Sequence, residues 1–180
     1  MRNFTVSRSA TLLLRLLIST KDRSSLDHVR WAILLRARQM LICVSDPIVE
    51  YDICDSKLRM PLSHDLPLIH RLYPLYSDNL GRIAAKLFTK YADLSVIDIG
   101  ANVGDSVAMI HRHIRVPVLC VEGEPRFGKL LAANVAYKVP APVIEQSFVG
   151  TGGEAFLAVV RHGTARLSPA WAEGATLQFA

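Results

Sequence analysis

The chain has 180 residues, of which 51% are apolar and 21% charged. These fractions indicate a globular protein with a sizeable core and exclude a disordered chain. The formal charge of +5 is modest, and no basic run is interleaved with aromatic residues, so we do not expect a nucleic acid as partner.

Three cysteines, Cys43, Cys54 and Cys120, are spread along the chain without a CxxC spacing. This scattered set argues against a disulfide framework and against a structural zinc site. We therefore expect reduced thiols, no bound metal and a cytoplasmic location. The apolar stretch 10–18 is interrupted by Arg15 and is shorter than the roughly 20 residues of a membrane-spanning helix, so we expect at most a loose contact with a membrane surface.

Residues 1–45 form a predicted N-terminal helical extension. Two apolar stripes recur there at helical spacing, and we interpret them as packing surface. A membrane-contacting amphipathic helix with arginine on its polar side is the alternative. The stripes are Leu12, Leu13, Leu16 and Leu17, and then Val29, Ile33, Leu34, Ala37 and Leu41.

The next part of the chain, residues 46–77, is predicted to hold a hairpin and a linker. The stretches 48–54 and 55–62 are two apolar runs joined by a short polar turn, which is typical of a β-hairpin. The remaining stretch, 63–77, is rich in proline, histidine and tyrosine, and we expect an irregular linker there.

Several histidines could act as ligands or bases. We interpret His64 and His70 as partly exposed loop residues, because they lie in the predicted linker. We expect His111, His113 and His162 at the surface.

From residue 78 to residue 180, short apolar runs alternate with helical patterns. This β-α-β-α-β order with short connections predicts an α/β fold with parallel strands and right-handed crossovers. We expect the first strand to be buried on both faces. The predicted elements are a helix at 78–92, strands at 95–100, 116–122 and 141–149, helices at 104–114 and 125–139, and a short antiparallel pair at 154–160 and 164–168.

Two carboxylates fall where the first two strands of this sheet end. Asp98 comes just before the turn from Gly100 to Gly104, and Glu122 closes the second strand. Ligands of open α/β sheets bind at the carboxyl ends of the strands. An acid about twenty residues after a glycine turn is placed to accept the hydroxyls of a ribose. The pattern therefore predicts a ligand that carries a ribose.

The turn itself reads G-A-N-V-G and lacks the G-x-G-x-x-G spacing of dinucleotide-binding folds, which argues against NAD or FAD. Asn102 stands where the middle glycine would be. No Gly-Lys-Ser/Thr follows, which excludes a P-loop.

Three motifs together resemble a known family. D-I-G-A-N-V-G-D, then V-E-G-E-P, then L-L-A-A-N-V, preceded by MPLSHDLPLIHRLYPLYSDNLGRIA, are similar to the FkbM family of class I S-adenosylmethionine-dependent methyltransferases. The resemblance covers roughly residues 45–160. It implies a Rossmann-like sheet in 78–180, S-adenosyl-L-methionine as cofactor, and O-methylation of a hydroxyl on a sugar, a glycan or another small molecule.

The resemblance also implies which residues bind the cofactor. Glu122 would hold the ribose hydroxyls, and Ser147 and Phe148 would lie at the adenine. The methionine and ribose side would be lined by Asp98, Gly100, Ala101, Asn102 and Gly104.

Purely structural roles are the alternative for several of these residues. Asp98 could cap the following helix, and Asn102 could be an ordinary turn residue. Glu122 and Glu124 could be solvated loop acids. We interpret Asp105 as a first-turn helix charge that complements the helix dipole.

The chain departs from the family after about residue 168. A further family motif of the form Lys-x-Asp-x-Glu-Gly is not found before Ala180, so we expect an incomplete sheet and name no catalytic residue. The first strand would then be an apolar edge, which predicts marginal stability or self-association. The competing functions are a non-catalytic cofactor-binding or interaction module, and a nicotinamide-dependent oxidoreductase.

Overall fold

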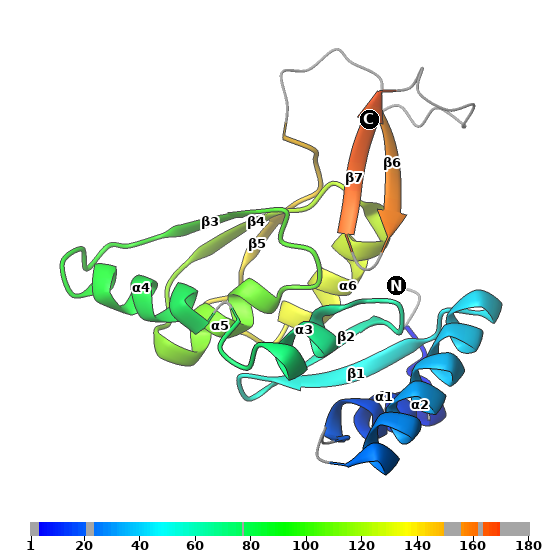
Figure 1. Cartoon of the computed structure of the whole chain (residues 1–180). Helices are drawn as coiled ribbons and strands as arrows, with labels where there is room; N and C mark the ends of the chain where they lie inside the picture. The colour runs from blue at the N-terminus through cyan, green and yellow to red at the C-terminus, as the bar shows by residue number, and fades with distance from the viewer. Residues whose placement is uncertain (1–3, 21–23, 77, 150–155, 162–163, 170–180) are drawn as a thin grey trace.

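The protein, described here by a computed structural model, has an α/β fold in which two N-terminal helices and an antiparallel hairpin precede a parallel β-α-β-α-β sheet (Figure 1). The structure describes residues 4–20, 24–76, 78–149, 156–161 and 164–169. The elements are α1 (Arg8–Ser19), α2 (Ser25–Val44), β1 (Ile48–Ile53), β2 (Ser56–Pro61), α3 (Leu66–Leu72), α4 (Asp78–Phe88), β3 (Val96–Ile99), α5 (Asp105–His113), β4 (Val118–Val121), α6 (Pro125–Val135), β5 (Val143–Glu145), β6 (Phe156–Arg161) and β7 (Thr164–Pro169).

The strands of this sheet are parallel, as the sequence predicts, and their order is β3-β4-β5. Asp98 is in register with Cys120, and Cys120 with Ile144. Because both crossovers run in the same direction with the same hand, α5 and α6 cover the same face. Figure 1 shows these helices under the sheet and the hairpin β1–β2 beyond them.

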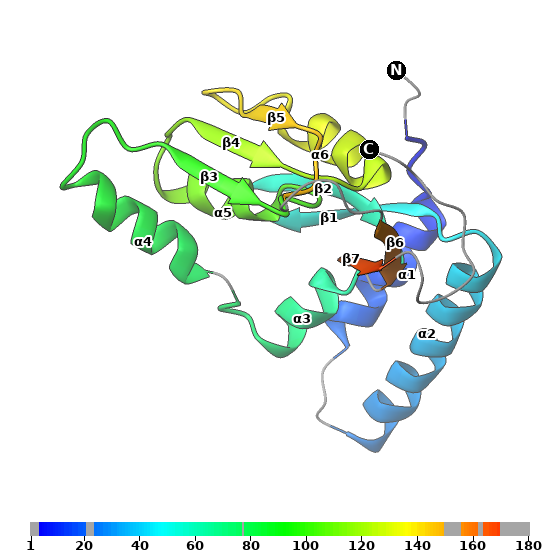
Figure 2. The same ribbon diagram turned by 90° about the horizontal axis from the view of Figure 1, so that it is seen from above.

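The other face of the sheet is exposed. Ile97 and Ile99 of β3 are 66% and 64% exposed, and Val143 of β5, on the far side of β4, is also exposed. The expectation that the first strand is buried on both faces is therefore wrong, since the two crossovers bring both of their helices to one side (Figure 2). β3 is also an edge strand of this sheet. Self-association through that edge stays a prediction, which sedimentation velocity over a range of concentrations would test.

The main core lies between the hairpin and the helix layer. Val49, Leu58 and Met60 of the hairpin are fully buried in one cluster with Phe127 and Leu130 of α6. The hairpin register pairs Tyr51 with Leu58, so alternate residues of each strand point into this core. A second cluster between the sheet and its helices contains Val107, Cys120 and Leu131.

The N-terminal helices pack differently from the predicted stripes. In α1 the buried leucines are Leu14 and Leu17, whereas Leu12 and Leu16 are exposed. On α2, Val29 and Ile33 are exposed, and only Leu34, Ala37 and Leu41 of the predicted stripe are half-buried. The packing interpretation is therefore wrong for Leu12, Leu16, Val29 and Ile33.

The predicted irregular linker contains α3. Pro67 lies in its first turn, where a missing N–H costs no helical hydrogen bond. The prediction of an irregular linker is therefore wrong for Leu66–Leu72. Later in the chain, β6 and β7 pair in antiparallel fashion, with Phe156 opposite Pro169, which confirms the predicted antiparallel pair.

Within the described ranges, no helix combines the length and apolar character that crossing a membrane requires.

Candidate functional site

The turn after β3 has a backbone that few residues can adopt. Gly100, Asn102 and Gly104 all have positive φ, at 78°, 50° and 87°. The N–H groups of Gly100 and Ala101 donate to the Val121 carbonyl at 2.9 and 3.1 Å, which ties the turn to the end of β4. A Cβ on Gly104 would lie 2.9 Å from Val135 Cγ1, so this position needs glycine for its conformation and for its packing against α6.

Glu122 joins the ends of two strands. Its carboxylate accepts the N–H of Asn102 at 2.8 Å through Oε2 and the N–H of Glu124 at 2.8 Å through Oε1. The side chain is only 6% exposed, so Glu122 is not a solvated loop acid. Each carboxylate oxygen has a second lone pair, which leaves acceptor capacity for a ligand. The two motif residues that the sequence separates by twenty positions therefore meet in space.

Glu124 also has a defined structural role. Its Oε2 accepts the N–H of Phe127 at 2.7 Å, which caps the N-terminus of α6. It is therefore a helix cap and not a solvated loop acid.

Asp98 faces the helix-covered side of the sheet. Burial raises the pKa of its carboxyl, the hydrogen bond with Ser106 opposes that shift, and the charge of Glu122 adds to it. Oδ2 is buried and has no hydrogen-bond partner among the described residues. A buried carboxylate oxygen without a donor is costly, and a ligand N–H or ammonium at the strand end would satisfy it.

Asp105 begins α5, in the first turn, as the sequence predicts. Burial raises its pKa to about 6, backbone N–H groups of Asp105 and Ser106 oppose the shift, and the charge of Asp98 adds to it. Two acids with raised pKa values thus lie at one helix N-terminus. Such a cluster is typical of functional sites.

Asp105→Asn is expected to stabilise the protein at pH 7 but not at pH 4. The Asp105 pKa of about 6 in the folded protein lies above the value of 3.8 that is usual for an aspartate in an unfolded chain. Between these values the folded chain keeps a proton that the unfolded chain loses, so stability falls as the pH rises through this window. Replacing the acid removes a penalty of about 2 to 3 kcal/mol above pH 6. Urea denaturation at both pH values measures it, with exposed Asp93→Asn as the control. An equal effect of Asp105→Asn at both pH values would contradict it.

His64 belongs to this site, and the sequence interpretation of it as a partly exposed loop residue is wrong. Its ring is buried. Nδ1 accepts the Leu66 N–H at 3.2 Å, so Nε2 carries the proton and donates to Asn102 Oδ1 at 3.3 Å. Burial lowers the pKa of His64, and the hydrogen bond with Asn102 opposes that shift. A neutral imidazole therefore holds the Asn102 side chain from the hairpin side.

His64→Phe is expected to lower the free energy of unfolding by about 1–3 kcal/mol. Phenylalanine keeps a ring beside Phe127, whose centroid lies 6.2 Å from that of His64, but it removes the acceptor of the Leu66 N–H and the donor to Asn102 Oδ1. Chemical denaturation measures the loss, and His28→Phe on the exposed side of α2 is the matched control. Equal stability of the two variants would rule out a positioning role for His64.

Asn134 connects the hairpin to the turn. Its buried amide accepts the Arg59 N–H at 2.8 Å and donates to the Arg59 and Val103 carbonyls, both at 2.9 Å. It is the asparagine of the L-L-A-A-N-V motif. The sequence did not assign this role, although the motif contained the residue.

The remaining predicted contacts lie at the same edge of the sheet. Phe148 is half-exposed. Its ring occupies the space into which a Cβ on Gly123, the residue that follows Glu122, would project. Ser147 precedes it and is half-buried. Ala101 is buried in the core cluster under the turn, so only its backbone can face a ligand.

The predicted surface position of the two α5 histidines holds for only one of them. His111 is 2% exposed, and its Nε2 lies 3.0 Å from the Val116 carbonyl, so the prediction of a surface residue is wrong. The last turn of α5 turns this residue toward the sheet, whereas His113 is exposed. His162 lies outside the described residues.

Within the described part of the chain, no group of three or more histidine, cysteine or acidic side chains is placed to hold a metal ion.

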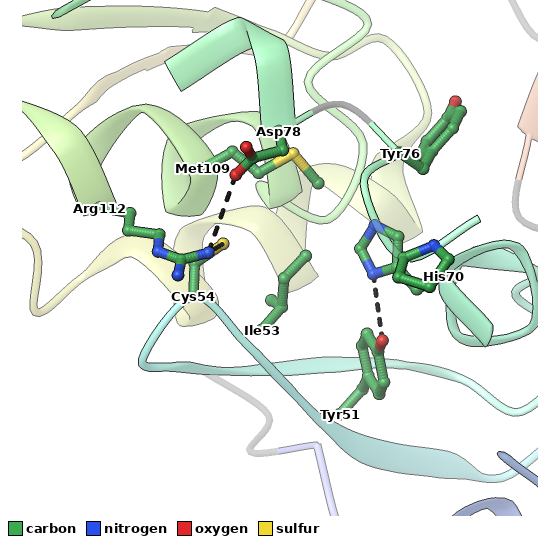
Figure 3. A pocket seen from close by; sticks show the side chains of 9 residues that line it. Tyr51, Ile53, Cys54, His70, Tyr76, Asp78, Met109 and Arg112 are labelled. Carbon is green, nitrogen blue, oxygen red and sulfur yellow. Dashed lines mark hydrogen bonds and ion pairs between the residues drawn. The ribbon is translucent and has the colours of Figure 1, made fainter. Parts of the chain in front are cut away.

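A separate cavity of about 260 Å³ lies on the outer side of α5, between the end of β1 and the segment that joins α3 to α4 (Figure 3). The Tyr51 hydroxyl and His70 Nδ1 lie 3.0 Å apart in its wall. Arg112 lies across from them, 3.8 Å from Asp78 Oδ1. Its lining shares no residue with the turn after β3, so the two sites are distinct.

Comparison with known proteins adds no relative: no protein-family model matches the chain, and no curated protein matches it.

Proposed function

We propose that this chain binds S-adenosyl-L-methionine at the turn after β3 and acts as an FkbM-like methyltransferase on a hydroxyl of a sugar, a glycan or another small molecule. The observation that carries the proposal is the bond from the Asn102 N–H to Glu122 Oε2, 2.8 Å long. It joins two of the motifs that carry the family resemblance at the carboxyl ends of two parallel strands, where α/β folds bind nucleotides.

Each part of the site has a function in this proposal. Glu122 would accept the ribose hydroxyls with its remaining lone pairs. Asp98 Oδ2 would accept the methionine ammonium, which supplies the donor that this buried oxygen lacks among the described residues. Phe148 is a half-exposed ring next to Gly123 and would stack on the adenine.

The cofactor, when bound, supplies an electrophilic methyl group on a sulfonium. Transfer needs the acceptor oxygen aligned with that methyl, and holding the two in line is the main contribution of such a site. The residues of the turn would fix one side of this geometry. No described residue is assigned here as a general base.

Calorimetric titration with S-adenosylhomocysteine tests the proposal. We expect a dissociation constant in the micromolar range and no measurable heat with NAD, because the turn lacks the G-x-G-x-x-G spacing. Binding without methyl transfer to any hydroxyl acceptor would favour the non-catalytic cofactor-binding module. Failure of a folded chain to bind S-adenosylhomocysteine would overturn the proposal, and binding of NAD instead would favour an oxidoreductase.

A further inference from the structure

The outer face of α2 is a stripe of exposed apolar side chains. Its members, Leu26, Val29, Ile33, Met40 and Val44, are between 57% and 82% exposed. With 3.6 residues per turn, all of them lie within about 40° of Ile33 around the helix axis. An exposed apolar stripe of this length on a surface helix indicates an interaction surface.

The opposite side of α2 already has its contacts within the fold. Arg38 is buried there, and its guanidinium donates to the Leu62 carbonyl and to Asp65 Oδ1, both at 3.1 Å. Trp31 on the same side lies under the Arg71 guanidinium, 3.8 Å from its ring centroid. These contacts fix which face of α2 turns outward, so the apolar stripe is not a core surface.

Basic residues border the stripe. Arg30 and Arg36 project at about 60° on either side of Ile33, and both are exposed. The helix's acidic residue, Asp27, lies well away from the stripe, at about 120°. Two helices of this kind from two copies would bring arginines together, which disfavours self-pairing. An anionic surface would pair with both arginines while it takes up the apolar side chains.

We propose that α2 lies in the interface of an anionic lipid bilayer, with Leu26, Val29, Ile33, Met40 and Val44 among the acyl chains and Arg30 and Arg36 at the lipid phosphates. Their long aliphatic stems allow the guanidinium groups to reach the headgroups while the helix sits lower. In this arrangement α2 lies parallel to the bilayer surface, within its interface, and does not span the membrane. It does not depend on the cofactor site.

Vesicle flotation tests the proposal with the full chain. We expect the protein to float with vesicles of phosphatidylcholine and phosphatidylglycerol, and to bind pure phosphatidylcholine about tenfold less tightly. Raising the salt concentration should weaken the binding to the anionic vesicles, because it screens the arginine contacts.

Substitutions separate the two parts of the surface. Ile33→Gln is expected to weaken binding about tenfold, since it removes one large apolar side chain from the bilayer. The Arg30→Gln, Arg36→Gln double variant should weaken it similarly and remove most of the salt dependence. Val139→Gln, at an equally exposed position outside α2, is the control and should bind like the wild type.

Three results would overturn the inference. One is absence of the protein from floated anionic vesicles, and another is equal binding by Ile33→Gln and Val139→Gln. The third is a concentration-dependent dimer that Ile33→Gln dissociates, which would assign the stripe to a second copy of the chain. Because every substituted side chain is exposed, circular dichroism should show unchanged folding in all variants.

Discussion

Glu122→Ala is expected to weaken S-adenosylhomocysteine binding by about 1–3 kcal/mol, or about 5- to 150-fold in the dissociation constant. The variant loses the carboxylate that is proposed to accept the ribose hydroxyls. It also removes the carboxylate to which the N–H groups of Asn102 and Glu124 each donate at 2.8 Å. The backbone turn that should contact the ligand therefore keeps its bonds to the Val121 carbonyl but loses its bond to the Glu122 side chain.

The matched control is Glu145→Ala. Glu145 ends the neighbouring strand β5, and its side chain is exposed, while its backbone carbonyl, which accepts the Glu122 N–H at 3.0 Å, is kept. We expect this variant to bind S-adenosylhomocysteine like the wild type in the same calorimetric titration. Equal binding by Glu122→Ala and Glu145→Ala would show that Glu122 is a structural acid and not a ligand contact.

Asn134→Leu is expected to lower the free energy of unfolding by about 3–5 kcal/mol. Leucine has nearly the same shape but no polar atoms. The Arg59 N–H, the Arg59 carbonyl and the Val103 carbonyl would lose the partners that they now have at 2.8 to 2.9 Å. Asn134 itself is 2% exposed, so water would not replace these bonds without opening the core. The hairpin and the turn should loosen together.

Urea denaturation measures this loss, with Asn79→Leu on the exposed face of α4 as the control. We expect the control to change stability by less than about 0.5 kcal/mol. Asn134→Leu should lower the urea concentration at the denaturation midpoint and leave the slope of the transition unchanged. An unchanged slope would mean that the variant and the wild type expose the same surface area on unfolding. A loss no larger than that of the control would show that the hairpin does not depend on Asn134.

The parallel sheet and its turn could be predicted from the sequence because their signals are local. Strands near 96–99, 118–121 and 143–145 follow from short apolar runs between turn residues, and the glycines at 100 and 104 mark a turn that needs positive φ. The spacing to Glu122 depends only on the length of one crossover. These features are set by residues close together in the chain.

What could not be predicted depends on long-range packing. His64 lies 38 residues before Asn102, and no local pattern indicates that the hairpin brings them together. The exposure of Ile97 and the burial of His111 follow from which face of the sheet receives the helices, and an apolar run alone does not specify this. Apolar residues lie on every side of α2, so the sequence could not show that Arg38 would face inward.

The most direct test of the central proposal is to locate bound S-adenosylhomocysteine by following backbone amide resonances during a titration of the ¹⁵N-labelled chain. We predict that the largest shifts fall on Gly100, Asn102 and Gly104, and on Gly123 and Phe148 across the strand ends. The amides around the separate cavity at Tyr51 and Arg112 should stay unchanged. Saturating ligand that shifts only the cavity residues, or none, would contradict a cofactor site at the turn after β3.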